Sequence, residues 1–231
     1  MLNFMLLFFR RLKALRHIGL GSNSSSFLFH KSVQIKAESG SEILINQGKV
    51  TLGFPISDPP FASHPKSFVS LGKNSRLIFN GSVAIAPGAT IRVRDNATVI
   101  FGGQNFVSHN LLLICEKHIE IEEFAALSWN VTLIDDDGHS FVDKKGRMLK
   151  GFYRPLVIRK NVGIQMNVQI PRGVQIGENS VISAGTILRQ DVPPNCLAYQ
   201  NFELRVRQGV SAPMTTSHAQ SKIANRSLVV S

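Results

Sequence analysis

The chain has few cysteines, the residues whose disulfides stabilise small extracellular domains. It contains only two cysteines, Cys115 and Cys196, among 231 residues. Two cysteines are too few for a disulfide-stapled secreted scaffold, and their separation does not match the paired spacing of zinc ligands. We therefore expect both to be free thiols in a reducing compartment, and the sequence predicts a cytoplasmic location.

Long hydrophobic runs are also scarce. The apolar run Met1–Phe9 is far shorter than the ~20 residues that a membrane-spanning helix needs, and its positive charges follow it, whereas a secretory signal places them first. Apolar residues recur at helical spacing at Leu2, Met5, Phe9 and Leu12. Residues 1–20 are therefore predicted to form a basic amphipathic helix. It either packs on the protein or contacts the inner face of a membrane through residues 1–16.

Acidic residues are in the minority, with 15 Asp and Glu against 26 Lys and Arg and a formal net charge of +11. Such a balance favours anionic partners, which include nucleic acids, membrane surfaces and phosphorylated small molecules. The sequence contains neither a recognisable nucleic-acid-binding module nor aromatic residues interleaved with Arg and Lys. We therefore expect no nucleic-acid partner.

The most informative feature is a strict six-residue period. Aliphatic residues recur at Ile158, Ile164, Ile170, Ile176, Ile182 and Leu188. Four positions after each of them stands a small or β-branched residue, at Val162, Val168, Val174, Ser180, Thr186 and Val192. An even period excludes an α-helix and fits extended chain, in which side chains alternate in direction.

Residue types at the corners agree with this interpretation. The position before each small residue holds Asn161, Asn167, Gly173, Asn179, Gly185 and Asp191, which are types that tolerate tight turns. Three six-residue units close one triangular coil, and coils stack at the usual strand spacing of ~4.8 Å. The sequence thus predicts an all-β fold, a left-handed parallel β-helix of hexapeptide repeats. Each isoleucine should lie over the one a full coil earlier.

The same pattern continues upstream with less regularity, as at Leu71, Leu77, Ile85 and Ile91. Solenoids accept irregular terminal repeats, so the β-helix is predicted over residues 33–207. Two excursions should leave it, a proline-rich one at 57–65 and a basic, projecting loop at 143–155. Residues 209–231 are polar and aperiodic and are predicted to be a flexible tail.

The densest group of reactive side chains follows one of the predicted core strands. Asp135, Asp136 and Asp137 lead through Gly138 to His139. A histidine is largely neutral at pH 7 and can take a proton from an alcohol, while a neighbouring carboxylate orients the ring. The alternative is a solvated acidic turn that carries an ordinary surface histidine.

These residues carry a resemblance to a known family. Asn130–Leu133 followed by Asp135, Asp137, Gly138 and His139 resembles the Asn-Val-Thr-(Ile/Leu) strand and Asp-x-Asp-Gly-His turn of the hexapeptide-repeat acetyltransferases, in particular the branch that modifies sugars in surface polysaccharide biosynthesis. The resemblance covers about Leu71 to Arg207. It implies that His139 is the general base that activates a sugar hydroxyl for attack on acetyl-CoA, with Asp137 orienting it and Asn130 near the acceptor.

The resemblance also implies a homotrimer that binds acetyl-CoA between subunits, without a metal. The backbone at Ala184 and Gly185 would contact the pantetheine arm, with Gly163 in the same donor site and Arg189 near a phosphate. The sequence departs from the family's Asn-Val-Trp-Ile-Gly motif, because Gly163 replaces the tryptophan and Gln165 the final glycine. These departures make the details of donor binding specific to this chain.

Two other functions remain open from the sequence. A catalytically silent β-helix that binds a partner is compatible with the altered donor motif. A metalloenzyme resembling the γ-class carbonic anhydrases would use histidines as zinc ligands, with His109, His118 and His139 as candidates.

Overall fold

The computed structural model describes residues 16–21, 25–55, 65–136, 141–149 and 154–201, without the side chains of 141, 142, 148 and 149. The described strands all belong to the compact unit that spans Met1–Gln200. Every regular element in these ranges is a β-strand. A search of the same ranges for an apolar helix of membrane-spanning length finds none.

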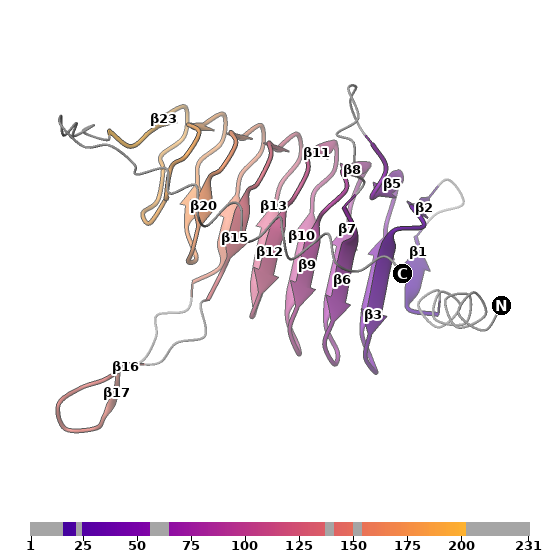
Figure 1. Ribbon diagram of the computed structural model, residues 1–231, viewed down its shortest axis with the longest axis horizontal. Coiled ribbons are helices and arrows are strands. Elements are labelled where there is room, and N and C mark those ends of the chain that lie inside the picture. Colours follow the sequence, from indigo (N-terminus) through magenta and orange to yellow (C-terminus); the bar gives the residue numbers. More distant parts are fainter. Residues whose placement is uncertain (1–15, 22–24, 56–64, 137–140, 150–153, 202–231) are drawn as a thin grey trace, which may run out of the picture. The chain divides into compact units, whose positions relative to one another are not determined.

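The strands form three parallel sheets (Figure 1). The first sheet contains β1 (Ile18–Leu20), β4 (Glu42–Ile45), β7 (Arg76–Phe79), β10 (Thr98–Phe101), β13 (His118–Ile121), β18 (Leu156–Ile158) and β21 (Gln175–Ile176). The second contains β2 (Ser26–Phe29), β5 (Lys49–Leu52), β8 (Val83–Ile85), β11 (Asn105–Val107), β14 (Ala126–Leu127), β19 (Gly163–Ile164), β22 (Val181–Ile182) and β23 (Leu197–Ala198). The third contains β3 (Val33–Ala37), β6 (Ser67–Leu71), β9 (Thr90–Val93), β12 (Leu112–Cys115), β15 (Thr132–Ile134) and β20 (Gln169–Ile170).

Consecutive strands visit the three sheets in turn. The chain runs from β4 in the first sheet through β5 in the second to β6 in the third, and then returns to the first at β7. From β4 on, each strand of these three sheets pairs in parallel with the strand one coil earlier, as β7 does with β4. The predicted left-handed parallel β-helix is therefore confirmed.

The core is a column of aliphatic side chains inside the coils. Ile158 lies in register with Ile176, and Ile164 with Ile182, so stacking at one-coil intervals is as predicted. All four are at most 2% exposed. Burial of each such side chain contributes about 1.5–3 kcal/mol relative to exposure. The early coils also accommodate aromatic rings, since Phe79 and Phe101 stack with centroids 5.3 Å apart.

Asparagines hold the corners, as their sequence positions predicted. Asn161, Asn179 and Asn195 adopt left-handed backbone conformations with φ between 57° and 60°. Their side chains form a ladder along the corner, because Asn161 Nδ2 donates to Asn179 Oδ1 at 2.9 Å and Asn179 Nδ2 donates to Asn195 Oδ1 at 3.1 Å. Gly173 has a different role, since a Cβ at this position would collide with the main chain of Arg154.

The solenoid begins earlier than residue 33. β1 pairs with β4 and β2 pairs with β5, so both strands belong to its first coil. The predicted helix over residues 1–20 is therefore wrong at 18–20, because the main chain of Ile18–Leu20 is bonded into the first sheet. Residues 1–15 lie outside the described part of the chain.

The second excursion also begins earlier than predicted. β15 ends at Ile134 and β18 begins at Leu156, so the chain leaves the coils before residue 143. The excursion contains an antiparallel hairpin of β16 (Phe141–Val142) and β17 (Met148–Leu149). Residues 137–140 and 150–153, most of the 57–65 excursion and the predicted tail 209–231 lie outside the described residues.

Candidate functional site

Asp135 directly follows β15 and anchors the corner of the preceding coil. Its side chain accepts three main-chain hydrogen bonds, from the N–H of Glu116 at 2.7 Å, Lys117 at 2.8 Å and His118 at 2.7 Å. Asp135 is only 2% exposed. A buried carboxylate needs such donors to offset its lost hydration. The Asp135 carboxylate therefore has a structural role at this corner.

The same carboxylate lies beside a buried cysteine. Cys115 Sγ is 3.7 Å from Asp135 Oδ2. Burial raises the pKa of the Cys115 thiol well above its usual value, and the negative charge of Asp135 raises it further. Cys115 is therefore a neutral thiol with a structural role. Both cysteines are free, as predicted.

Asp135 also fixes the point at which the chain leaves the coils. Its carbonyl oxygen accepts a hydrogen bond from Gly173 N at 3.1 Å, which ties it to the following coil as well. Asp135 is thus bonded to both neighbouring coils. Asp137 and His139 themselves lie outside the described residues, and their predicted roles stay predictions.

Asn130 lies at the corner between the second and third sheets, which we call the second–third corner (residues 128–131, 165–168 and 183–186). Its backbone is left-handed, with a φ of 57°. Its side chain accepts a hydrogen bond from Asn110 at 3.0 Å and donates one to Asn167 at 3.0 Å. This carboxamide is a link in a corner ladder, which leaves one N–H and one lone pair of Oδ1 for the predicted contact with an acceptor.

Ala184 and Gly185 lie at the same corner, where a ridge of larger side chains stops. Trp129 and Met166 occupy the matching position in the two preceding coils and are 38% and 41% exposed. In the next coil the matching residues are the small Ala184 and, after it, Gly185. Gly185 has a φ of +73°, and a Cβ there would have no neighbour within 4 Å. We call these two small, exposed residues the corner notch.

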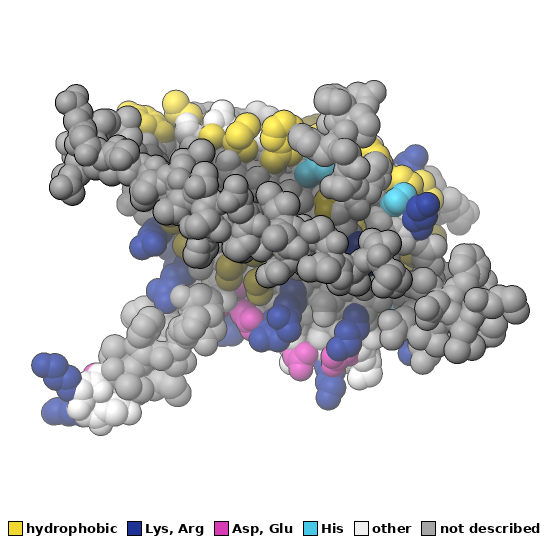
Figure 2. Space-filling model, in the orientation of Figure 1, with side chains coloured by type: hydrophobic (Ala, Val, Ile, Leu, Met, Phe, Trp, Pro, Cys, Tyr) yellow, Lys and Arg dark blue, Asp and Glu magenta, His cyan; other side chains and the backbone are white. Residues whose placement is uncertain are grey.

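Gly163 lies on the outer face of the second sheet. The register places one outward column on this face, and none of its members is charged: Leu28, Thr51, Ala84, Phe106, Ala126, Gly163, Val181 and Leu197. Figure 2 shows hydrophobic side chains gathered along the upper edge, over this sheet, with charged side chains below. A Cβ at Gly163 would meet only Val181, at 3.8 Å, so packing within the chain does not require glycine here.

Arg189 lies at another corner, between the third and first sheets. It follows Ile187, which bridges to Gln169 in the third sheet, and precedes Val192, which bridges to Ile176 in the first. Next to it, Asp191 accepts a hydrogen bond from Arg154 at 2.8 Å, and this bond lowers the pKa of Asp191. The predicted donor-binding residues thus lie in three places: Gly163 on the second sheet, Ala184 and Gly185 at the second–third corner, and Arg189 at the corner beyond the third sheet. Asp135, which follows β15 of the third sheet, lies at the same corner as Arg189 in an earlier coil.

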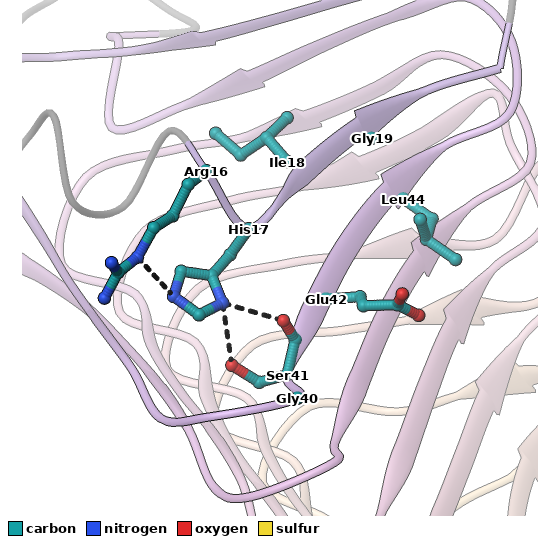
Figure 3. A pocket seen from close by; sticks show the side chains of 8 residues that line it. All are labelled: Arg16, His17, Ile18, Gly19, Gly40, Ser41, Glu42 and Leu44. Carbon is teal, nitrogen blue, oxygen red and sulfur yellow. Dashed lines mark hydrogen bonds between the residues drawn. The ribbon is translucent and has the colours of Figure 1, made fainter.

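A hollow of about 350 Å³ lies at the other end of the first sheet, beside β1 and β4 (Figure 3). His17 lines it, with Nδ1 lying 2.8 Å from the carbonyl oxygen of Ser41 and Nε2 accepting a hydrogen bond from Arg16 at 3.4 Å. Both ring nitrogens are therefore engaged. None of the residues predicted for catalysis or donor binding lines this hollow.

Within the described ranges, His, Cys, Asp and Glu side chains form no group of three that could hold a metal ion. His118, one of the candidate zinc ligands, instead lies 3.6 Å from the carboxylate of Glu120. The described coils thus offer no support for a zinc site at His118.

Sequence comparisons identify the repeat. The family profile of the bacterial transferase hexapeptide (six repeats) matches residues 155–190. The chain is 37% identical over 99 residues to galactoside O-acetyltransferase of Escherichia coli strain K12, covering 42% of this chain and 47% of that protein. It is 30% identical over 106 residues to galactoside O-acetyltransferase of Lactococcus lactis subsp. lactis strain IL1403, covering 43% and 51% respectively. The chain thus spans about half the length of these curated relatives.

Among solved structures, the polySia specific acetyltransferase NeuO aligns with a TM-score of 0.43 and 18% identity, over 91% of this chain and 99% of that one. The repeat match and the two sequence relatives confirm the resemblance to the hexapeptide-repeat acetyltransferases, and the coil architecture confirms the fold predicted from the six-residue period. This chain carries the bacterial transferase hexapeptide repeat on a left-handed parallel β-helix and is similar in sequence to sugar O-acetyltransferases.

Proposed function

We propose that this protein transfers an acetyl group from acetyl-CoA to a hydroxyl group of a sugar, in the biosynthesis of a surface polysaccharide. The observation that carries the proposal is the similarity to two galactoside O-acetyltransferases. In the described coils, Asp135, four residues before His139, is held by three main-chain hydrogen bonds.

In this mechanism His139 accepts the proton of the sugar hydroxyl, and the hydroxyl oxygen attacks the thioester carbonyl carbon of acetyl-CoA. The C–S bond then breaks, and the protonated imidazole returns the proton to the departing CoA sulfur. Asp137 orients the ring and stabilises its charged form. Ala184 and Gly185 contact the donor through their backbone, and Arg189 lies near a phosphate of CoA.

A homotrimer would explain how donor-binding residues at different corners of the chain can form one site. Ala184 and Arg189 lie at different corners of one chain, but a groove between two copies can bring different corners together. The uncharged outer column of the second sheet supports association, because exposed apolar faces of this kind are usually covered by a partner. We place the protein in the cytoplasm, with residues 1–16 as a contact to the inner face of the membrane.

The test is an acetylation assay on the full chain. Purified protein is incubated with acetyl-CoA and a panel of sugars and glycosides, and released CoA thiol is measured together with product mass. We expect a product heavier by one acetyl group, and cleavage of that group by hydroxylamine would identify an oxygen ester. Absence of both an acetylated sugar and CoA binding would contradict the proposal.

A further inference from the structure

Two glutamine side chains form hydrogen bonds with main-chain groups in and beside the corner notch. Gln165 Oε1 accepts a hydrogen bond from the N–H of Ala184 at 3.0 Å. Gln200 bonds to both main-chain groups of Ile187: its Oε1 accepts from Ile187 N at 2.8 Å and its Nε2 donates to Ile187 O at 3.1 Å. Both glutamines are exposed.

These contacts differ from the regular hydrogen bonding of the coils. At the same corner, Asn130, Asn167 and Gly185 donate their main-chain N–H to carbonyl oxygens of the preceding coil. Ala184, the residue before Gly185, donates to a side-chain carboxamide. At Ile187 a carboxamide makes the contacts that main chain makes at the matching residue Gln169, whose N–H donates to Thr186 O and whose carbonyl oxygen accepts from Leu188 N. The N–H of Ala184 and both main-chain groups of Ile187 are thus satisfied by side-chain amides that are not part of the backbone ladder.

An extended ligand with amide groups can make the same contacts. The pantetheine arm of an acyl-CoA carries two secondary amides joined by methylene groups. Its amides match the carboxamides of Gln165 and Gln200 in hydrogen-bonding type. Its methylene groups can lie against Met166, 41% exposed in the coil before the notch, and Tyr199, 68% exposed in the coil after it.

We infer that Gln165 and Gln200 occupy the subsite of the donor's pantetheine arm and are displaced when the donor binds. This inference rests on the proposed function. The exchange is feasible because both side chains are exposed and each bond between neutral groups has a small net strength. Gln165 is then a specificity-determining residue that competes with the donor for the N–H of Ala184.

The test is calorimetric titration of the full chain with CoA and with pantetheine, which lacks the charged phosphates. Gln165→Ala removes the competitor, so we expect both ligands to bind about two- to tenfold more tightly, the equivalent of one net hydrogen bond. Gln200→Ala should act in the same direction. Gln34→Ala, an exposed glutamine on β3 at the other end of the third sheet, is the matched control and should bind like the wild type.

Gln165→Glu provides the opposite change. A carboxylate accepts from the N–H of Ala184 more strongly than a neutral amide does, so pantetheine should bind more weakly than to the wild type. Unchanged or weaker pantetheine binding by Gln165→Ala would overturn the inference while leaving the proposed function intact. If the wild type binds neither CoA nor pantetheine, the proposed function is overturned, and the inference with it.

Discussion

Asp135 is the residue whose replacement should have the largest structural effect at the candidate site. Asp135→Asn keeps the size of the side chain but leaves one carbonyl oxygen to accept from three main-chain N–H groups. Its NH₂ group would face donors in a buried site. Each buried donor that loses its acceptor costs about 1–3 kcal/mol, so we expect a loss of roughly 2–4 kcal/mol in the free energy of unfolding.

The assay is unfolding by urea and by heat. For a domain of this size, 1 kcal/mol corresponds to about 2–4 °C, so the melting temperature should fall by roughly 5–15 °C. Asp95→Asn is the matched control, because exposed Asp95 accepts only one main-chain N–H, from Lys73 at 3.0 Å, and asparagine retains that acceptor. An Asp135→Asn protein as stable as this control would refute the structural role assigned to Asp135.

Two further predictions concern local structure. Phe124 adopts a left-handed backbone with a φ of 60° at a corner where other coils place asparagine, so Phe124→Asn should raise the melting temperature by a few degrees; a lower melting temperature would contradict this. Asp143 accepts hydrogen bonds from the main chain and guanidinium of Arg147, which lower its pKa below the ordinary 3.8. The turn should therefore persist above pH 3.8 and be lost only as the pH falls through the lower folded value. NMR titration of the Asp143 carboxyl checks this, and a midpoint at or above 3.8 would refute it.

The six-residue period was sufficient to predict the late coils. Ile158, Ile164 and Ile176 are buried where predicted, because a solenoid repeats one local unit and the sequence repeats with it. The first coil was missed because its sequence does not repeat in this way. β1 and β2 are short and contain no hexapeptide spacing, and their strand structure depends on pairing with β4 and β5.

The candidate site was less accessible from the sequence, because its geometry depends on contacts between coils. Asp135 appeared to be one of three similar carboxylates, and only stacking on Glu116–His118 distinguishes it. Its position directly after a core strand was the one available signal. Gln165 appeared as a departure from a family motif, but the N–H that it occupies belongs to Ala184 in the next coil. No local pattern in the sequence indicates such a contact.

The central claim is tested most directly by the rate of acetyl transfer in His139→Ala at saturating acetyl-CoA. Loss of a general base should lower this rate about 10²- to 10⁴-fold, with unchanged CoA affinity and melting temperature. His118→Ala, which removes a histidine paired with Glu120, should transfer acetyl groups at the wild-type rate. A His139→Ala protein that is as active as the wild type would contradict the account.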